Sequence, residues 1–148
     1  MKIFEPQERS PMLLKYLLDV WERSVRATHL FLSDQEVCQI RQYVPQALCS
    51  VQHLVVAANG SIPAGFMGVE GKTLEMLFLA PEERGKGLGR ELLQHGIDVY
   101  SVDHLTVNEQ NPDARGFYEH MGFRVYRRTA LDGQGTPYPL LYMRRIDR

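Results

Sequence analysis

A glycine-rich stretch, ERGKGLGRELL, occupies positions 83–93 and follows the apolar run TLEMLFLAP. The apolar run is typical of a strand, and the apolar residues after the glycines recur at helical spacing. The first turn of a helix presents unpaired N–H groups and the positive end of its dipole, which attract phosphate. Glycine lets the backbone approach an anion closely, and Arg84 and Lys86 add positive charge. The stretch 84–89, the glycine turn below, is therefore a predicted phosphate or pyrophosphate site.

Two common phosphate-binding motifs do not fit the glycine turn. A P-loop requires a lysine followed by Ser or Thr, but Lys86 is followed by Gly87. A dinucleotide fingerprint requires G-x-G-x-x-G, but Gly89 comes one position early for its third glycine. From these residues alone, a structural connector that binds no ligand stays open as the alternative.

Glu75 is a candidate base, because it lies in the middle of TLEMLFLA with apolar neighbours. Strand alternation predicts that Glu75 lies on the same face as Thr73, Leu77 and Leu79. A carboxylate on that face can remove a proton directly or through a water molecule. The alternative is an ordinary strand residue that faces solvent.

The histidines and cysteines do not form a recognisable metal or nucleophile motif. His53, His95, His104 and His120 are scattered without H-E-x-x-H or another metal-binding spacing, so we expect no metal. The two cysteines, Cys38 and Cys49, lack the C-x-x-C spacing of redox and zinc motifs. We expect both thiols to be reduced and buried.

The elements that must position these groups alternate in a recognisable order. Ser10 and Pro11 predict the start of a first helix, as N-cap and first helical residue. The capping-box pattern S-x-x-E at 33–36 predicts a second helix that runs through Val44 and stops near Pro45. The remaining predicted elements are a first strand at 1–4, an antiparallel meander at 53–58, 62–70 and 73–80, a helix after the glycine turn, a strand at 104–107, a helix from Asn111 to Gly122, and closing strands at 123–131 and 139–146. This order predicts a mixed α/β (α+β) fold with a mostly antiparallel central sheet flanked by helices.

Length and composition set further limits. A chain of 148 residues, 44% hydrophobic and 24% charged, predicts one globular domain that spans residues 1–148. The formal net charge of −1 provides no general attraction to nucleic acid or to an acidic membrane. We see neither a signal-peptide core nor an apolar run long enough for a bilayer, so a cytoplasmic location is the default expectation.

Two motifs together resemble those of a known family, the GNAT superfamily of acyl-CoA-dependent N-acetyltransferases. The family pattern R-G-x-G-x-G-x-x-L-L is matched by residues 84–93, and N-x-x-A-x-x-F-Y-x-x-x-G-F is matched by residues 111–123. The matched region covers roughly a third of the chain, and the order of elements outside it also fits.

The resemblance implies a fold and a set of roles. The sheet is expected to open between the strand that ends at Leu79 and the strand at 104–107, which makes a slot for the acyl group. The backbone of the glycine turn holds the coenzyme A pyrophosphate, and Asn111 bonds the pantetheine amide. Tyr118 protonates the departing thiolate, although a core aromatic residue is the alternative. The expected cofactor-binding set is Leu77, Phe78, Leu79, Arg84, Gly85, Lys86, Gly87, Leu88, Gly89 and Asn111.

The acceptor side is less patterned. The resemblance places His29, between the first two helices, beside the acceptor site, where it binds substrate or acts as base; a cap or surface residue is the alternative. Tyr138, before Pro139, either lies near the acceptor pocket or belongs to a turn before a buried strand.

The resemblance implies an N-acetyltransferase that moves an acetyl group from acetyl-CoA to a primary amine by direct attack. The amine belongs to a small molecule, a protein N-terminus or a lysine. We expect a monomer or homodimer, with no nucleic-acid or membrane partner. Two alternatives stay open: a non-catalytic acyl-CoA-binding module, and a protein-interaction domain without coenzyme.

Overall fold

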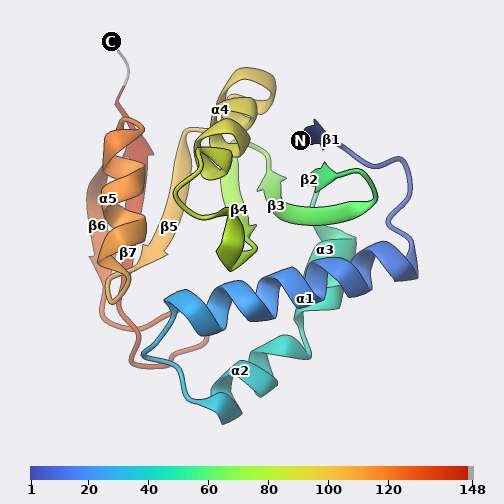
Figure 1. Ribbon diagram of the computed structural model, residues 1–148. Coiled ribbons are helices and arrows are strands. Elements are labelled where there is room, and N and C mark those ends of the chain that lie inside the picture. Colours follow the sequence, from blue (N-terminus) through green and yellow to red (C-terminus); the bar gives the residue numbers. More distant parts are fainter. Residues whose placement is uncertain (147–148) are drawn as a thin grey trace.

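The computed structural model describes residues 1–146 of the chain. Its centre is a seven-stranded sheet with the order β1-β2-β3-β4-β5-β7-β6 (Figure 1). The strands are β1 (Lys2–Phe4), β2 (His53–Asn59), β3 (Ile62–Glu70), β4 (Thr73–Leu79), β5 (His104–Asn108), β6 (Phe123–Thr129) and β7 (Leu140–Arg145). Every neighbouring pair is antiparallel except β4 and β5, which run parallel. The predicted mixed, mostly antiparallel sheet is confirmed.

The parallel pair opens soon after it forms. Strands β4 and β5 are in register only at Thr73 with His104 and at Leu74 with Leu105. Beyond Leu74, β4 pairs only with β3, while β5 pairs with β7 along its whole length. The sheet therefore splits into two parts between β4 and β5, at the place where the family resemblance implies a slot for the acyl group.

Helices cover both faces of the sheet. One apolar core joins the sheet to α4 (Leu88–Tyr100) and α5 (Pro112–His120), which lies over β6 and β7 in Figure 1. A second core joins the other face to α1 (Pro11–Thr28), α2 (Asp34–Arg41) and α3 (Val44–Ser50). Alternation along β2 supplies both cores, because Val55 and Ala57 enter the first core and Leu54 and Val56 enter the second.

The region after α2 differs from its prediction. The predicted second helix ends at Arg41, and a separate short helix, α3, begins at Val44 with Pro45 in its first turn. A proline lacks an N–H and has a fixed φ, so it breaks a helix interior but suits a helix start. Pro45 therefore begins a helix where the sequence predicted an end.

The expectation of buried cysteines is wrong. Cys38 and Cys49 are both exposed and free. The adjacent residues Val37 and Leu48 are the ones that turn inward from α2 and α3. Successive helical residues are rotated by about 100°, so a cysteine next to a buried residue points elsewhere.

The face predicted for Glu75 is also wrong. Strand β4 carries a β-bulge, because Gly68 pairs with Met76 and the next residue, Val69, pairs with Leu74. Glu75 is the extra residue and is exposed. An extra residue shifts the alternation by one position, so Leu74, instead of Glu75, joins Leu77 and Leu79 in one core.

Candidate active site

The glycine turn is held open by its backbone. A short 3₁₀ turn, Pro81–Glu83, leads into it, and Gly87 is the N-cap of α4. Gly85 and Gly87 have φ values of 74° and 89°. These values lie in the left-handed region, where a residue with a side chain is strained. A Cβ atom at either position would meet nothing within 4 Å. These glycines therefore serve the backbone conformation and leave space beside the start of α4 empty.

That space belongs to a cavity of about 510 Å³, the glycine-turn cavity. The first residues of α4 line it together with Arg84, Gly85 and Gly87, so uncapped N–H groups and a guanidinium border one volume. This arrangement suits an anion. Residues 77–79 of β4 and Asn111 and Tyr118 from the opposite side also line it. Of the predicted cofactor-binding residues, only Lys86 is not part of this lining.

A second cavity, of about 240 Å³, lies where β4 and β5 separate and is called the splay cavity. Asn111 and Tyr118 line it as well, which connects it to the glycine-turn cavity. Asn111 is the N-cap of α5, and its side-chain oxygen accepts a hydrogen bond from the Ala114 N–H at 3.3 Å. The amide NH₂ of Asn111 is not used by this cap and can donate to a ligand.

Tyr118 packs between two other aromatic rings, with its centroid 5.2 Å from Phe117 and 6.3 Å from Phe123. Burial raises the pKa of the Tyr118 hydroxyl, because an anion there would lack solvent. The hydroxyl therefore keeps its proton at neutral pH. A protonated phenol beside both cavities is suited to donate that proton.

His29 is the C-cap residue of α1, and its orientation follows from the end of that helix. The Thr28 hydroxyl donates to the Ser24 carbonyl at 2.8 Å, so it accepts from Nδ1 of His29, also at 2.8 Å. This network assigns the proton of neutral His29 to Nδ1 and leaves Nε2 as an acceptor. Burial lowers the pKa of His29, since the charged imidazolium loses solvation. His29 is therefore a neutral base at neutral pH.

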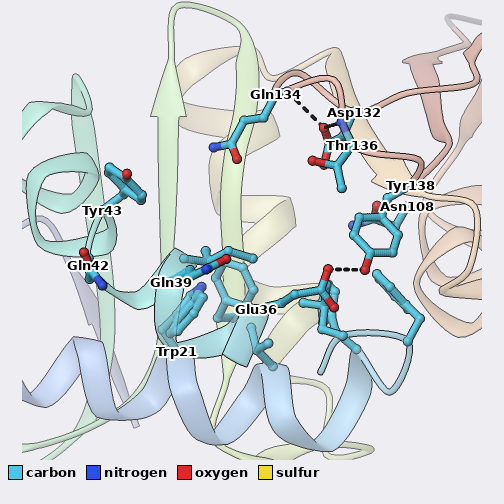
Figure 2. A pocket seen from close by; sticks show the side chains of 16 residues that line it. Trp21, Glu36, Gln39, Gln42, Tyr43, Asn108, Asp132, Gln134, Thr136 and Tyr138 are labelled. Carbon is cyan, nitrogen blue, oxygen red and sulfur yellow. Dashed lines mark hydrogen bonds between the residues drawn. The ribbon is translucent and has the colours of Figure 1, made fainter. Parts of the chain in front are cut away.

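A third cavity, of about 620 Å³, is called the helix–loop cavity (Figure 2). One wall comes from α1 and α2, and the other comes from the loop at 130–139 between β6 and β7. The Tyr138 hydroxyl donates to Glu36 across this space, which ties the loop to α2 (Figure 2). His29 and Phe78 line all three cavities. The neutral imidazole therefore lies where an anion site, a slot in the sheet and a wide open cavity meet.

Comparison with known proteins shows the family of the chain. The family model of the GNAT acetyltransferase domain matches residues 26–135. The peptidyl-lysine N-acetyltransferase YjaB of Salmonella typhimurium is 39% identical over 125 residues, which cover 84% of this chain and 86% of that protein. The chain belongs to the GNAT family.

Solved structures share the fold. The solution structure of apo YjaB from Escherichia coli aligns over the whole of both chains, with a TM-score of 0.87 and 37% identity. PH1933 from Pyrococcus horikoshii aligns over 99% of both chains, with a TM-score of 0.79 and 20% identity. This GNAT protein is an acetyl-CoA-dependent N-acetyltransferase, which transfers an acetyl group to an amine. The predicted family, fold and reaction are confirmed.

The candidate residues of this GNAT enzyme do not all line the same cavity. Tyr118, Asn111 and most of the glycine turn lie together around the glycine-turn cavity. Glu75 lines the splay cavity and a separate outer hollow beside α3, but neither of the two larger cavities. The Glu75 side chain is exposed but partly desolvated by the atoms around it, and this partial desolvation, together with the nearby Glu70 carboxylate, raises its pKa.

Sequence reasoning missed most of the helix–loop cavity. Glu36 was predicted as part of a capping box, which is confirmed, but its other carboxylate oxygen accepts from Tyr138. Asp132, Gln134 and Thr136 were not singled out, although the Asp-Gly-x-Gly run is a loop signal. Tyr138 lines this cavity and also lies in the loop directly before β7, whose Leu141 and Met143 are buried, so both interpretations of Tyr138 are compatible with the structure. No local pattern connects α2 with a loop about a hundred residues later.

Within residues 1–146, the structure contains no group of three or more His, Cys, Asp or Glu side chains that could hold a metal ion. No helix in the same range is long and apolar enough to cross a membrane.

Proposed function

We propose that this enzyme acetylates lysine side chains of proteins or peptides. His29 carries the proposal, because a neutral base at the meeting point of the three cavities can reach an amine that enters through the open helix–loop cavity. The two YjaB relatives, from Salmonella typhimurium and Escherichia coli, are peptidyl-lysine N-acetyltransferases at 39% identity, which supports the same acceptor here.

We assign the cofactor roles as follows. The N–H groups of the glycine turn and Arg84 hold the pyrophosphate of acetyl-CoA, because the anion needs donors and positive charge. The backbone of Leu77, Phe78 and Leu79 pairs with the pantetheine arm, since β4 has no partner strand on its β5 side there. Asn111 donates to a pantetheine carbonyl from the amide group that its capping role leaves free.

The chemical step needs a base and an acid. The lysine amine must be neutral to attack the thioester carbonyl, and it forms the new C–N bond while it gives a proton to Nε2 of His29. The C–S bond then breaks, and the thiolate takes the proton of the Tyr118 hydroxyl. The products are an amide and free coenzyme A. His29 then releases its extra proton to solvent, and Tyr118 regains a proton from solvent.

A cytosolic location is consistent with two free, exposed cysteines, because exposed thiols persist in reducing compartments. We propose that location for this enzyme. The expected monomer or homodimer stays a prediction.

The acceptor is tested by mass spectrometry of peptides incubated with acetyl-CoA. One peptide carries a single lysine and a blocked N-terminus, and its partner carries a free N-terminus with the lysine replaced by glutamine. We expect a 42 Da gain on the lysine peptide only. Acetylation of the N-terminal amine alone would contradict the proposal.

The acid is tested by Tyr118→Phe, which removes the hydroxyl and keeps the ring that packs between Phe117 and Phe123. We expect kcat to fall by about 10²-fold, a usual contribution of general acid catalysis. The Kd of acetyl-CoA, measured by calorimetry, should stay within about twofold. An unchanged kcat would exclude Tyr118 as the proton donor.

A further inference from the structure

The helix–loop cavity has an uneven charge. Among the described residues that line it, two are carboxylates, Glu36 and Asp132, and none is a lysine or arginine. The whole chain is nearly neutral, with a formal net charge of −1. The lining of this cavity is therefore negative, although the chain as a whole is nearly neutral.

Glu36 is kept ionised by two donors. Its Oε1 accepts from the backbone N–H of Ser33 at 2.9 Å, and its Oε2 accepts from the Tyr138 hydroxyl. These two hydrogen bonds, that of Ser33 first, lower the pKa of Glu36. In Figure 2 Glu36 reaches from α2 toward the loop that bears Tyr138. A negative charge is thus fixed in position on the wall of the cavity.

Asp132 is held in place by its own loop. One carboxylate oxygen, Oδ1, accepts from the backbone N–H groups of Gln134 and Thr136, both at 2.9 Å. The Asp132 N–H in turn donates to the Thr136 carbonyl at 2.9 Å. Within residues 1–146, no hydrogen bond or ion pair occupies Oδ2 of Asp132, which can therefore accept from a ligand.

Aromatic rings connect this charged region to His29. The Tyr138 ring lies 5.4 Å from Phe31, and Phe31 lies 5.5 Å from His29, measured between centroids. Trp21, Tyr43 and Phe78 line the same cavity. Aromatic faces attract cations and pack against aliphatic chains, so this wall suits an alkyl ammonium group and its stem.

We propose that the preferred acceptor carries a second positive charge beside the amine that is acetylated, and that Glu36 and Asp132 bind it. The inference rests on the proposed function: when a lysine side chain extends to His29, its peptide backbone stays in the outer part of the cavity. A neighbouring arginine or lysine then comes within reach of the two carboxylates. The substrate class is a lysine in a basic sequence, and Glu36 and Asp132 determine specificity.

The test compares three blocked peptides that differ only in the residues on both sides of one lysine, which are arginine, glutamine or glutamate. The measurement is kcat/KM for each peptide with the wild-type enzyme, Glu36→Gln, Asp132→Asn, the double variant and Asp98→Asn. Asn keeps the one oxygen that accepts both hydrogen bonds of Asp132. Gln keeps one oxygen for the Ser33 N–H, and its NH₂ group can donate to the Tyr138 oxygen in place of the bond that Glu36 accepts, so both changes remove charge with little loss of structure. Asp98 is an exposed carboxylate of α4 that lines none of the cavities, and its variant matches the change in net charge.

We expect the wild-type enzyme to favour the arginine peptide over the glutamine peptide by about threefold to tenfold, mainly through KM, as partly exposed charge pairs do. The glutamate peptide should be the poorest. The preference should shrink in each single variant, vanish in the double variant, persist in Asp98→Asn and weaken as salt is raised to about 0.5 M. Equal use of all three peptides, or a preference that survives in the double variant, would overturn the inference.

A small-molecule arm separates this inference from the proposed function. 1,4-Diaminobutane and butylamine differ only in a second charge, and their kcat/KM values are measured with the same variants. If no lysine peptide is acetylated but the diamine is favoured and the double variant removes the preference, the lysine proposal fails and the second-charge inference stands. If lysine peptides are acetylated without regard to flanking charge, the lysine proposal stands and the second-charge inference fails.

Discussion

The glycine-turn cavity and the helix–loop cavity, which are the two sides of the site that meet at His29, are built in different ways. Two local patterns at the ends of regular elements supply much of the glycine-turn cavity: the glycine turn before α4, and Asn111 before α5. The helix–loop cavity is made by residues that meet only through tertiary structure, such as Glu36 and Tyr138, which are 102 positions apart. With the roles proposed above, the first side binds an invariant cosubstrate, whereas the second can vary its acceptor through a loop, because loops tolerate sequence change without loss of the core.

The largest expected effect is at His29, which lines both cavities. We predict that His29→Gln lowers kcat/KM by about 10²- to 10⁴-fold, because Gln cannot accept the amine proton as a base. Acetyl-CoA should still bind, since the proposed anion site lies in the glycine turn. Activity is measured by release of free thiol, and binding by calorimetry. His104→Gln is the matched control, because His104 is exposed and lines none of the three cavities.

The pH dependence follows from the lowered pKa of His29. A base works only when it is unprotonated. Because the pKa of His29 lies below the ordinary value of about 6.5, His29 stays mostly unprotonated at pH values down to about 6.5. The acceptor amine also titrates, but its effect cancels in the ratio of wild-type to His29→Gln activity. This ratio should be flat above about pH 6.5 and fall as pH decreases further. A ratio that does not change with pH would show that His29 is not the base.

A smaller effect is expected on the glycine side alone. Gly87→Ala forces a side chain into φ 89°, which costs about 1–2 kcal/mol, and places a methyl group at the anion site. We predict a Kd for acetyl-CoA raised by about tenfold, with the kcat at saturation changed by less than threefold, given that each tenfold is about 1.4 kcal/mol.

Gly89→Ala is the matched control for this change. Gly89 has no positive φ, and its Cβ would make ordinary contacts of 3.5 Å to Leu79 and 3.6 Å to Phe117. The Kd of acetyl-CoA should therefore change by less than about threefold. If Gly89→Ala weakens binding as much as Gly87→Ala does, the left-handed conformation is not what prepares the turn.

The same division explains what the sequence could predict. The glycine turn, the Asn111 cap and the helix carrying Tyr118 are local patterns, and the structure contains them where the residues indicate. Pairs of motifs with fixed spacing also identified the family and the fold. These features depend on hydrogen bonds and dihedral angles within a few residues, which is the range that sequence patterns describe.

The remaining features depend on distant residues. The bulge at Glu75 comes from how β4 pairs with β3, and strand alternation alone predicts the wrong face. The joining of Glu36 to Tyr138 requires the whole chain to fold between them. Pro45 and Cys38 show the same limit at short range, because the choice between helix end and helix start, or between inward and outward faces, was settled by packing.

The smallest expected effect concerns Glu75, which lines the splay cavity but neither of the two cavities compared above. We predict that Glu75→Gln changes kcat/KM by less than about threefold, because His29 supplies the base that general catalysis needs. The variant should also gain stability near pH 7. Partial desolvation and Glu70 raise the pKa of Glu75, so its charge disfavours the folded state above that pKa, and the difference from Glu75→Gln should disappear as pH falls below about 4.5. Thermal melting from pH 4 to pH 8 measures this. A loss of activity of tenfold or more, together with a changed pH–rate profile, would show that Glu75, at the bulge of β4, is the base instead of His29.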